Sequence, residues 1–323
     1  MLQPHVLLVS GMQVLPVKNK IYVAIASYRD PLLTSTIQSL YENADNPKNV
    51  TVGCFIQAYE QDRDVETPGE RFIDKQVFYQ VINPGSVFSI TECRNRAMQF
   101  LSEEHTYVLQ VDSHTRFHKG WDSILLNYIK DLPLKSAIST YLPGWRPLLT
   151  GEEEVLFNSG FFEPTFTKLS KDKLNEGEII PENVYIESDN RFLYKSWYLA
   201  AHCLFARKEL FKHINQQNWI MFWGEEFVNS LSAASEGWDV YLPYSPPLSH
   251  MYPQDVPYLN LNKLFKDFPD EWGKKSSETT KTILDMLNNR VERKGFTQAG
   301  LDKITAHIGY DLVEQFNDFL KED

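Results

Sequence analysis

KIYVAIASYRDPLLTSTIQSLYENADNPKNVTVGCFIQA (residues 20–58) is the stretch that decides the fold. Residues 21–26 form a continuous apolar run, which is typical of a strand covered on both faces of a parallel sheet. Apolar residues then recur at helical spacing over residues 31–44, after a proline that a helix tolerates in its first turn. Residues 49–58 return to a strand pattern. This β-α-β order predicts an α/β fold with a mostly parallel, doubly wound sheet.

The alternation of strands and helices continues along the chain. The expected elements are strands at 76–82, 106–114 and 135–143, helices at 89–103 and 120–132, a strand and helix at 196–214, and a turn, helix and strand at 221–243. We expect the irregular residues 144–196 to form strands and loops on the acceptor side. From about residue 255 the chain is polar and helical. The expected division is therefore a catalytic domain at 1–254 and a C-terminal helical extension at 255–323.

Composition and charge narrow the classes of partner. The 323 residues carry a net charge of −11 and contain no run of Lys or Arg. Long nucleic acid is therefore disfavoured as a bound partner, although not as a substrate, and so is an anionic membrane surface.

The cysteines and the apolar runs bear on the compartment. The three cysteines, Cys54, Cys93 and Cys203, are widely spaced and form no CxxC pair, which disfavours a disulfide framework. No stretch approaches the ~18 apolar residues of a membrane span, and no secretory signal pattern is recognisable. We expect a cytoplasmic protein that does not associate with a membrane.

The strongest local signal is Asp112-Ser113-His114, which directly follows an apolar strand. Ligands of open α/β sheets bind beyond the carboxyl ends of strands. In an extended chain, Asp112 and His114 would point the same way and could share a divalent cation. Mn²⁺ accepts this mixture of oxygen and nitrogen ligands, and Mg²⁺ is the less suited alternative. The competing interpretation is a polar strand end with solvated side chains.

Two later segments contain further candidates. His250, in a proline-rich loop, could supply a third metal ligand, although a structural role is the plainer interpretation. Trp223 offers a flat face to a sugar ring, and Gly224 permits a tight turn. Glu225 and Glu226 are candidate catalytic carboxylates, since adjacent buried carboxylates raise one another's pKa. The alternative is a helix N-terminus whose acidic pair favours the macrodipole.

The end of the first strand and the helix at 89–103 supply candidates for donor binding. Ser27, Tyr28, Arg29 and Asp30 follow the first strand, where a uracil-type base could stack on Tyr28 and pair with Asp30. An Arg29–Asp30 surface turn is the alternative. The arginines of CRNRA could reach a ribose or diphosphate, or could lie on a solvated helix face. The two arginines are Arg94 and Arg96. Ser113, at the end of a later strand, is a further candidate for donor binding.

The ordered segments resemble a known family, the cytoplasmic polypeptide N-acetylglucosaminyltransferases that modify hydroxyproline on a ubiquitin-ligase adaptor, together with their bacterial relatives. The resemblance rests on the stretch at 21–57, on CRNRAMQFLSEEHTYVLQVDSHTRFHKGWD, and on AAHCLFARKELF, WGEEFVNSLSAASEGWDVYLP and LSHMY in that order. A weaker similarity follows in GYDLVEQFNDFL.

The resemblance implies a GT-A fold, a UDP-sugar donor such as UDP-GlcNAc, a divalent metal, and retention of configuration at the anomeric carbon. It assigns Asp112 and His114 to the metal motif and His250 to a later ligand position. It also implies that Glu225 and Glu226 lie near the acceptor and the anomeric carbon.

The resulting hypothesis is a metal-dependent, retaining glycosyltransferase that moves GlcNAc or another hexose from a UDP-sugar to an acceptor hydroxyl. The acceptor could be a protein, a glycan or a hydroxylated base in phage DNA. A module that binds nucleotide-sugars or glycans without catalysis is the alternative from another class. A two-metal phosphoesterase would need additional Asp and His ligands.

Overall fold

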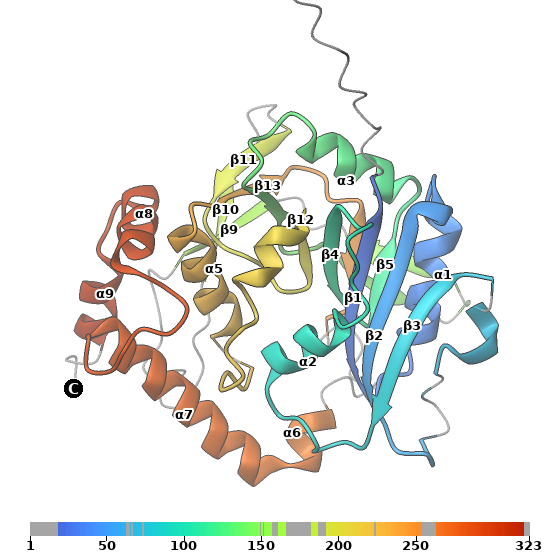
Figure 1. The fold of residues 1–323 in the computed structure, drawn as a ribbon, viewed down its shortest axis with the longest axis horizontal. Coiled ribbons are helices and arrows are strands. Elements are labelled where there is room, and N and C mark those ends of the chain that lie inside the picture. The colour runs from blue at the N-terminus through green and yellow to red at the C-terminus, as the bar shows by residue number, and fades with distance from the viewer. Residues whose placement is uncertain are drawn as a thin grey trace, which may run out of the picture.

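The computed structural model describes residues 19–62, 65, 67–72, 74–148, 150, 152–156, 161–165, 182–186, 192–222, 224–252 and 263–319. An eight-stranded mixed sheet forms the centre of this part of the chain, with helices on its two faces (Figure 1). Its strand order is β11-β13-β6-β12-β4-β1-β2-β3. The strands are β1 (Ile21–Tyr28), β2 (Val50–Gln57), β3 (Gln76–Ile82), β4 (Tyr107–Asp112), β6 (Ser136–Ser139), β11 (Leu193–Ser196), β12 (Cys203–Arg207) and β13 (Asp239–Pro243).

The half of the sheet formed by β4, β1, β2 and β3 is parallel, as the β-α-β pattern predicts. In the other half, β12 runs antiparallel to β4 and β6, while β13 is parallel to β6. The predicted α/β class with a mostly parallel sheet is therefore confirmed.

Alternate residues of β1 face opposite layers of helices, as the two-residue period of a strand requires. Ile21, Val23 and Ile25 pack in the core that contains α1 (Leu33–Asn43) and α3 (Trp121–Ile129). The residues between them, Tyr22 and Ala24, pack in a second core with α2 (Ile90–Ala97). All five side chains are at most 1% exposed, so β1 is a central strand buried on both faces.

Gly53 of β2 is required by a close approach to the neighbouring strand and helix. The Tyr22 hydroxyl lies over it and donates a hydrogen bond of 2.6 Å to the carbonyl of Ala97. A Cβ atom on Gly53 would lie 1.6 Å from that hydroxyl and 2.5 Å from the same carbonyl oxygen. Only glycine leaves room for α2 to pack this near the sheet.

A smaller sheet, with the order β5-β14-β7-β8, adjoins the carboxyl end of β4. A two-stranded ribbon of β9 and β10 completes the described strands between residues 144 and 196. The expectation of strands in this region is confirmed, and part of it joins the sheet that carries His250. The strands are β5 (Thr115–Phe117), β7 (Gly144–Pro147), β8 (Glu153–Leu156), β9 (Phe161–Thr165), β10 (Glu182–Ile186) and β14 (Leu248–His250).

The C-terminal helices share a core with the α/β part of the chain. Leu231 of α5 and Leu301 of α8 belong to one buried cluster, which also includes Ile283 of α7 and Phe316 of α9. The segment after the proposed boundary at residue 254 is predominantly helical, and it packs directly on α5 of the preceding part of the chain. The C-terminal helices are α6 (Lys263–Asp267), α7 (Pro269–Leu287), α8 (Gln298–Ile308) and α9 (Leu312–Phe319), and the helix on which they pack is α5 (Glu225–Ser235).

Several expected elements differ in extent or type from the prediction. The helix expected at 89–103 stops at Ala97, because residues 98–101 turn back toward β4. The strand expected to reach His114 stops at Asp112 and is followed by a turn. In the segment 196–214, the strand begins only at Cys203, and a short 3-10 helix (Lys208–Lys212) replaces the expected α-helix.

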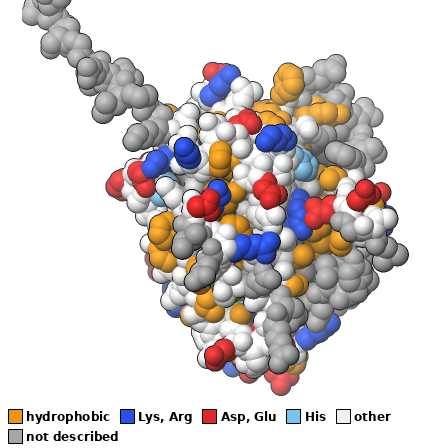
Figure 2. Space-filling model, turned by 90° about the vertical axis from the view of Figure 1, so that its right-hand side faces the viewer, with side chains coloured by type: hydrophobic (Ala, Val, Ile, Leu, Met, Phe, Trp, Pro, Cys, Tyr) orange, Lys and Arg blue, Asp and Glu red, His pale blue; other side chains and the backbone are white. Residues whose placement is uncertain are grey.

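The surface agrees with the predicted charge pattern. On the face shown in Figure 2, the described acidic and basic side chains are interspersed and form no continuous basic stripe. The three cysteines are free and buried, so the prediction of no disulfide framework is confirmed.

Candidate active site

The order of the strands reverses between β1 and β4. From β1 the chain moves outward to β2 and β3, and then returns to place β4 on the opposite side of β1. Open α/β sheets bind ligands at such a switch point, outside the carboxyl ends of the strands. Ser27 and Tyr28 end β1, and Asp112 ends β4 beside Ala26. The predicted donor-side and metal-side residues therefore lie at the same edge of the sheet.

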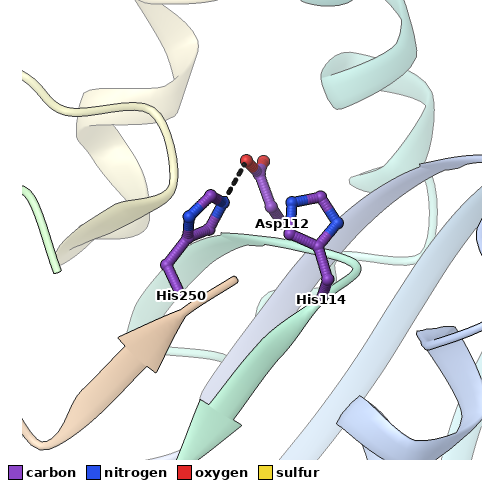
Figure 3. Close-up of side chains that lie close together, drawn as sticks. All are labelled: Asp112, His114 and His250. Carbon is purple, nitrogen blue, oxygen red and sulfur yellow. Dashed lines mark hydrogen bonds and ion pairs between the residues drawn. The ribbon is translucent and has the colours of Figure 1, made fainter. Parts of the chain in front are cut away.

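Asp112, His114 and His250 form one group at this edge (Figure 3). One potential ligand atom from each residue lies within 4.8 Å of the others. The reason is not the extended chain that the sequence suggested, because residues 113–114 form a turn. That turn leads into β5, and β14 pairs with β5 so that His250 lies opposite Thr115.

A buried carboxylate orients His114. Nδ1 of His114 lies 2.7 Å from Oδ2 of Asp30, which is only 4% exposed. If this nitrogen donates to Asp30, the other ring nitrogen is left as the ligand, as in many carboxylate–histidine–metal arrangements. The Ser113 hydroxyl donates to the same Asp30 oxygen, and the backbone N–H of Leu32 donates to the other one. Asp30 thus faces the histidine group, whereas the sequence suggested that it would pair with a base.

The remaining features of the group also suit a divalent cation. Nε2 of His250 lies 3.3 Å from Oδ2 of Asp112, and Nδ1 of His250 is buried without a hydrogen-bond partner among the described residues. Burial lowers the pKa of His250, which favours the neutral imidazole that binds metals. Burial opposes ionisation of Asp112, but the positive charge of Arg94 and the hydrogen bond with His250 lower its pKa well below the usual value. One carboxylate and two imidazoles are a donor set that Mn²⁺ accepts.

Arg94 connects Asp112 to Glu225. Its side chain is 4% exposed, and its Nη2 lies 3.1 Å from Oδ1 of Asp112. Its Nε lies 2.6 Å from Oε1 of Glu225, an ion pair whose atoms are not aligned as a hydrogen bond. Nη1 of Arg94 is buried and has no partner among the described atoms. Burial raises the pKa of Glu225 to about 7 in spite of this arginine.

Glu226 has a different environment from its neighbour. Its Oε1 accepts a hydrogen bond of 2.6 Å from the backbone N–H of Ala201. Its Oε2 accepts bonds of 2.9 Å from the Tyr141 hydroxyl and 3.2 Å from the Tyr198 hydroxyl. Burial still raises its pKa, but its two oxygens are occupied by protein donors. The two carboxylates are therefore not equivalent.

The acidic pair also begins a helix, as the alternative interpretation expected. Gly224 adopts a left-handed conformation with φ of 92°, and α5 starts at Glu225. The positive end of the helix dipole favours carboxylates in this first turn. The two interpretations are compatible, because the turn that caps the helix also directs Glu225 toward Arg94. Trp223 lies outside the described residues.

The other donor-binding candidates separate into distinct environments. The Ser27 hydroxyl is buried at the switch point and has no hydrogen-bond partner among the described residues. Arg96 is 40% exposed and pairs with Glu92 on the surface of α2, so it is not drawn into the group around Asp112. Tyr28 and Arg29 contact Asp267 from α6, and Arg29 does not pair with Asp30.

Several residues of the site were not predicted. Tyr141 and Tyr198 hold Glu226, and the buried His202 ring lies 4.6 Å from the His250 ring, centroid to centroid. These residues lie near the ends of short strands and in the irregular segment before β12, where hydrophobic periodicity gave no signal. Only the local segment AAHC, which belongs to the resemblance quoted above, indicated that part of the chain.

Several of the buried polar atoms that lack a hydrogen bond among the described residues lie at this site, although others lie elsewhere. Native proteins satisfy nearly all such atoms, so a cluster of exceptions marks a place where a ligand can supply the missing bonds. These atoms are the Ser27 hydroxyl, Nη1 of Arg94 and Nδ1 of His250, whereas Nε of Arg94 and Oε1 of Glu225 face one another as an ion pair. Potential cation ligands and buried polar atoms without hydrogen bonds, at the switch point of a mixed α/β sheet, are the features of a ligand-binding site.

Comparisons with known proteins indicate the class of enzyme to which this site belongs. A family model described as Glycosyltransferase (GlcNAc) matches residues 20–70 and 65–312. The chain belongs to this family of glycosyltransferases.

A solved structure supports the fold assignment. A crystal structure of GalNAc-T7 with UDP, GalNAc and Mn²⁺ matches 94% of this chain with a TM-score of 0.57 and 13% sequence identity. The chain spans 56% of that protein's chain. At this identity the match concerns the fold alone.

The other comparisons add little. A search of curated proteins found no match. Among the described residues, no helix is long and apolar enough to cross a membrane.

Proposed function

We propose that this chain is a metal-dependent, retaining glycosyltransferase that uses a UDP-sugar donor, with UDP-GlcNAc as the first candidate. The observation that carries the proposal is the group of Asp112, His114 and His250 at the switch point of the sheet. The GalNAc-T7 structure, whose fold is similar, contains UDP and Mn²⁺, which supports the same donor class here. Membership of a glycosyltransferase family disfavours a binding module without catalysis.

We assign the metal-binding role to Asp112, His114 and His250, with Mn²⁺ preferred over Mg²⁺. A bound divalent cation would act as a Lewis acid that stabilises the departing diphosphate. Asp30 would keep the His114 ring in the orientation that presents its free nitrogen.

Arg94 is the candidate for binding the diphosphate. Its Nη1 is unpartnered, and its side chain is already fixed between Asp112 and Glu225, so it is preorganised to stabilise negative charge. The Ser27 hydroxyl at the end of β1 has no hydrogen-bond partner within the described ranges, so it is available to accept a hydrogen bond from the nucleoside or to donate one to it. Trp223 and Arg96 remain sequence-based candidates for donor binding.

The environments of the two glutamates favour Glu225 as the one that acts on the reacting centre. Glu226 is fully hydrogen-bonded by protein groups, whereas Glu225 pairs only with Arg94 among the contacts described above. Ionised Glu225 could stabilise positive charge at the anomeric carbon, or orient the acceptor hydroxyl that attacks from the same face as the leaving group. Glu226 would then have a structural role, in which it fixes the side chains of Tyr141 and Tyr198 by accepting hydrogen bonds from their hydroxyls.

The acceptor is a hydroxyl on a protein, as the resemblance suggests, on a glycan, or on a modified nucleobase. Interspersed surface charge on the face in Figure 2 favours an acceptor recognised locally over a long nucleic acid. The free, buried cysteines support a reducing, cytoplasmic location.

A donor screen tests the proposal. The purified protein would be incubated with Mn²⁺ and UDP-GlcNAc, UDP-glucose or UDP-GalNAc, and released UDP would be measured. We expect UDP release from at least one donor, abolished by EDTA and lowered at least ~100-fold by Asp112→Ala. Asp131→Ala, which changes an exposed carboxylate after α3, serves as the matched control. Full activity of Asp112→Ala would refute the metal assignment.

A further inference from the structure

Four charged or polar side chains from three segments meet at the carboxyl end of β1. Arg29 pairs with Asp62 through two bonds, Nε to Oδ2 at 2.9 Å and Nη2 to Oδ1 at 2.6 Å. Its third nitrogen, Nη1, donates to Oδ2 of Asp267 at 2.7 Å. The Tyr28 hydroxyl donates to the same Asp267 oxygen at 2.8 Å. Asp267 is the last residue of α6, so a C-terminal helix reaches back to the first strand.

The backbone at Arg29 shows that this arrangement is imposed by its surroundings. Arg29 has φ of 48°, a left-handed conformation that costs a non-glycine residue about 1–2 kcal/mol. The other two non-glycine residues with positive φ among those described are Asn215 and Asn289, and asparagine tolerates this conformation better. The Arg29 N–H donates to the carbonyl of Gln57 at 2.8 Å, which anchors the turn to β2.

The charge of Arg29 is already balanced. Two carboxylates contact the guanidinium, and its Cζ atom lies 5.1 Å from the centroid of the Tyr59 ring. Its three contacting nitrogens are all used. Arg29 therefore differs from Arg94, which keeps an unpartnered nitrogen. Arg29 is therefore better suited to link the end of β1 to Asp62 and Asp267 than to bind a diphosphate directly.

The chain directly after Asp267 also packs against the α/β part of the protein. The next residue, Phe268, packs edge-to-face on Phe88, with ring centroids 5.3 Å apart. The same ring covers Gly85, where a Cβ atom would lie 2.4 Å from it. Gly85 and Phe88 belong to the connection between β3 and α2, the helix that carries Arg94. In Figure 1, α6 is drawn below α2, near the end of the sheet toward which the arrow of β3 points.

We propose that Asp267 is a positioning residue for the nucleoside end of the donor site. It fixes the Tyr28 ring and the Arg29 turn next to Ser27, whose hydroxyl has no hydrogen-bond partner in the described part of the chain, and so makes donor affinity depend on the C-terminal helices. The inference rests on the proposed function, because it assumes that a UDP-sugar binds at the switch point. A preordered ring and turn lose less conformational freedom when the donor binds, which increases affinity without changing the chemical step.

The test compares Asp267→Ala and Asp267→Asn with Asp270→Ala, a control at an exposed carboxylate on α7. UDP binding in Mn²⁺ would be measured by calorimetry, and donor KM and kcat by UDP release. For Asp267→Ala we expect Kd and KM to rise about five- to tenfold, with kcat within about twofold of wild type. Asp267→Asn keeps an acceptor for the Tyr28 hydroxyl and should recover part of the affinity. Affinity for Mn²⁺ alone should match that of the control.

A double-mutant cycle tests whether Tyr28 and Asp267 act through the same contact. Tyr28→Phe removes only the hydroxyl, so its effect should largely disappear when Asp267 is already alanine. Unchanged UDP affinity in Asp267→Ala, or a fall in kcat at constant KM, would overturn the inference while leaving the proposed function intact. A wild-type protein that binds no UDP would instead overturn the proposed function, and this inference with it.

Discussion

Glu225→Gln removes a buried ionisable group and should change how stability depends on pH. Burial raises the pKa of Glu225 from 4.5 to about 7 in the folded protein. Between these values the folded protein keeps a proton that the unfolded chain has released. The contribution of protonated Glu225 to the free energy of unfolding is therefore fully present below pH 4.5 and is lost as the pH rises through about 7. Glutamine has nearly the same shape and does not titrate.

The size of the effect follows from the pKa difference. A shift from 4.5 to about 7 corresponds to about 3 kcal/mol in full, at 1.36 kcal/mol for each unit. Over the accessible interval from about pH 5 to about pH 8, linkage gives a loss of about 2.5 kcal/mol. The groups that set the shift besides burial are Arg94, which lowers the pKa of Glu225, and Glu226 and Asp112, which raise it.

Urea unfolding of both proteins from pH 5 to pH 8 measures this effect, with EDTA present so that metal binding adds nothing. We expect the stability of wild type relative to Glu225→Gln to fall by about 2.5 kcal/mol across this range. Glu60→Gln, at an exposed position, is the matched control and should follow wild type at every pH. Parallel curves for wild type and Glu225→Gln would refute the claim that burial raises this pKa.

Three further predictions follow from contacts described above. Asp30→Asn should weaken Mn²⁺ affinity about 10- to 100-fold in calorimetry, because His114 loses the carboxylate that orients it; unchanged affinity would contradict this role. Gly53→Ala should lower the free energy of unfolding by about 3 kcal/mol, since its Cβ would lie 1.6 Å from the Tyr22 hydroxyl, whereas Gly273→Ala, with open space around it, should not destabilise. Deleting residues 263–323 should expose the core face of α5 and lower the thermal midpoint or solubility; a stable, soluble fragment would support an independent domain.

The pattern of apolar residues in the sequence predicts those helices and strands whose side chains are buried in a regular way. Residues 21–26 and 49–58 read as strands because β1 and β2 are covered on both faces and tolerate few polar side chains. The boundary of α2 was missed for a related reason. Met98, Phe100 and Leu101 are apolar because they pack in the core beside Ala97, although the chain has already left the helix there. Their composition continues the helical pattern while the hydrogen bonds do not.

The grouping of Asp112, His114 and His250 was predictable only in part from the sequence. Asp112 follows an apolar strand, which fixes its place at the edge of the sheet, and His114 is near in the chain. The sequence assigned the right neighbours for a wrong reason, since a turn brings His114 to Asp112. Asp30 was assigned to the base because it follows β1, but only the three-dimensional path of the 112–115 turn shows that it faces His114. Pairings of this kind depend on strand order, which composition does not specify.

The adjacent carboxylates Glu225 and Glu226 illustrate what the fold adds to a motif. Successive residues of a helix point about 100° apart, so two neighbours in the first turn of α5 must face different surroundings. One direction leads to Arg94 and, beyond it, to Asp112; the other leads to Ala201 and two tyrosine hydroxyls. A sequence of two glutamates leaves their roles interchangeable, but these surroundings do not. In the proposed function, the start of α5 therefore directs Glu225 toward the reacting centre and Glu226 toward the tyrosine hydroxyls beside it.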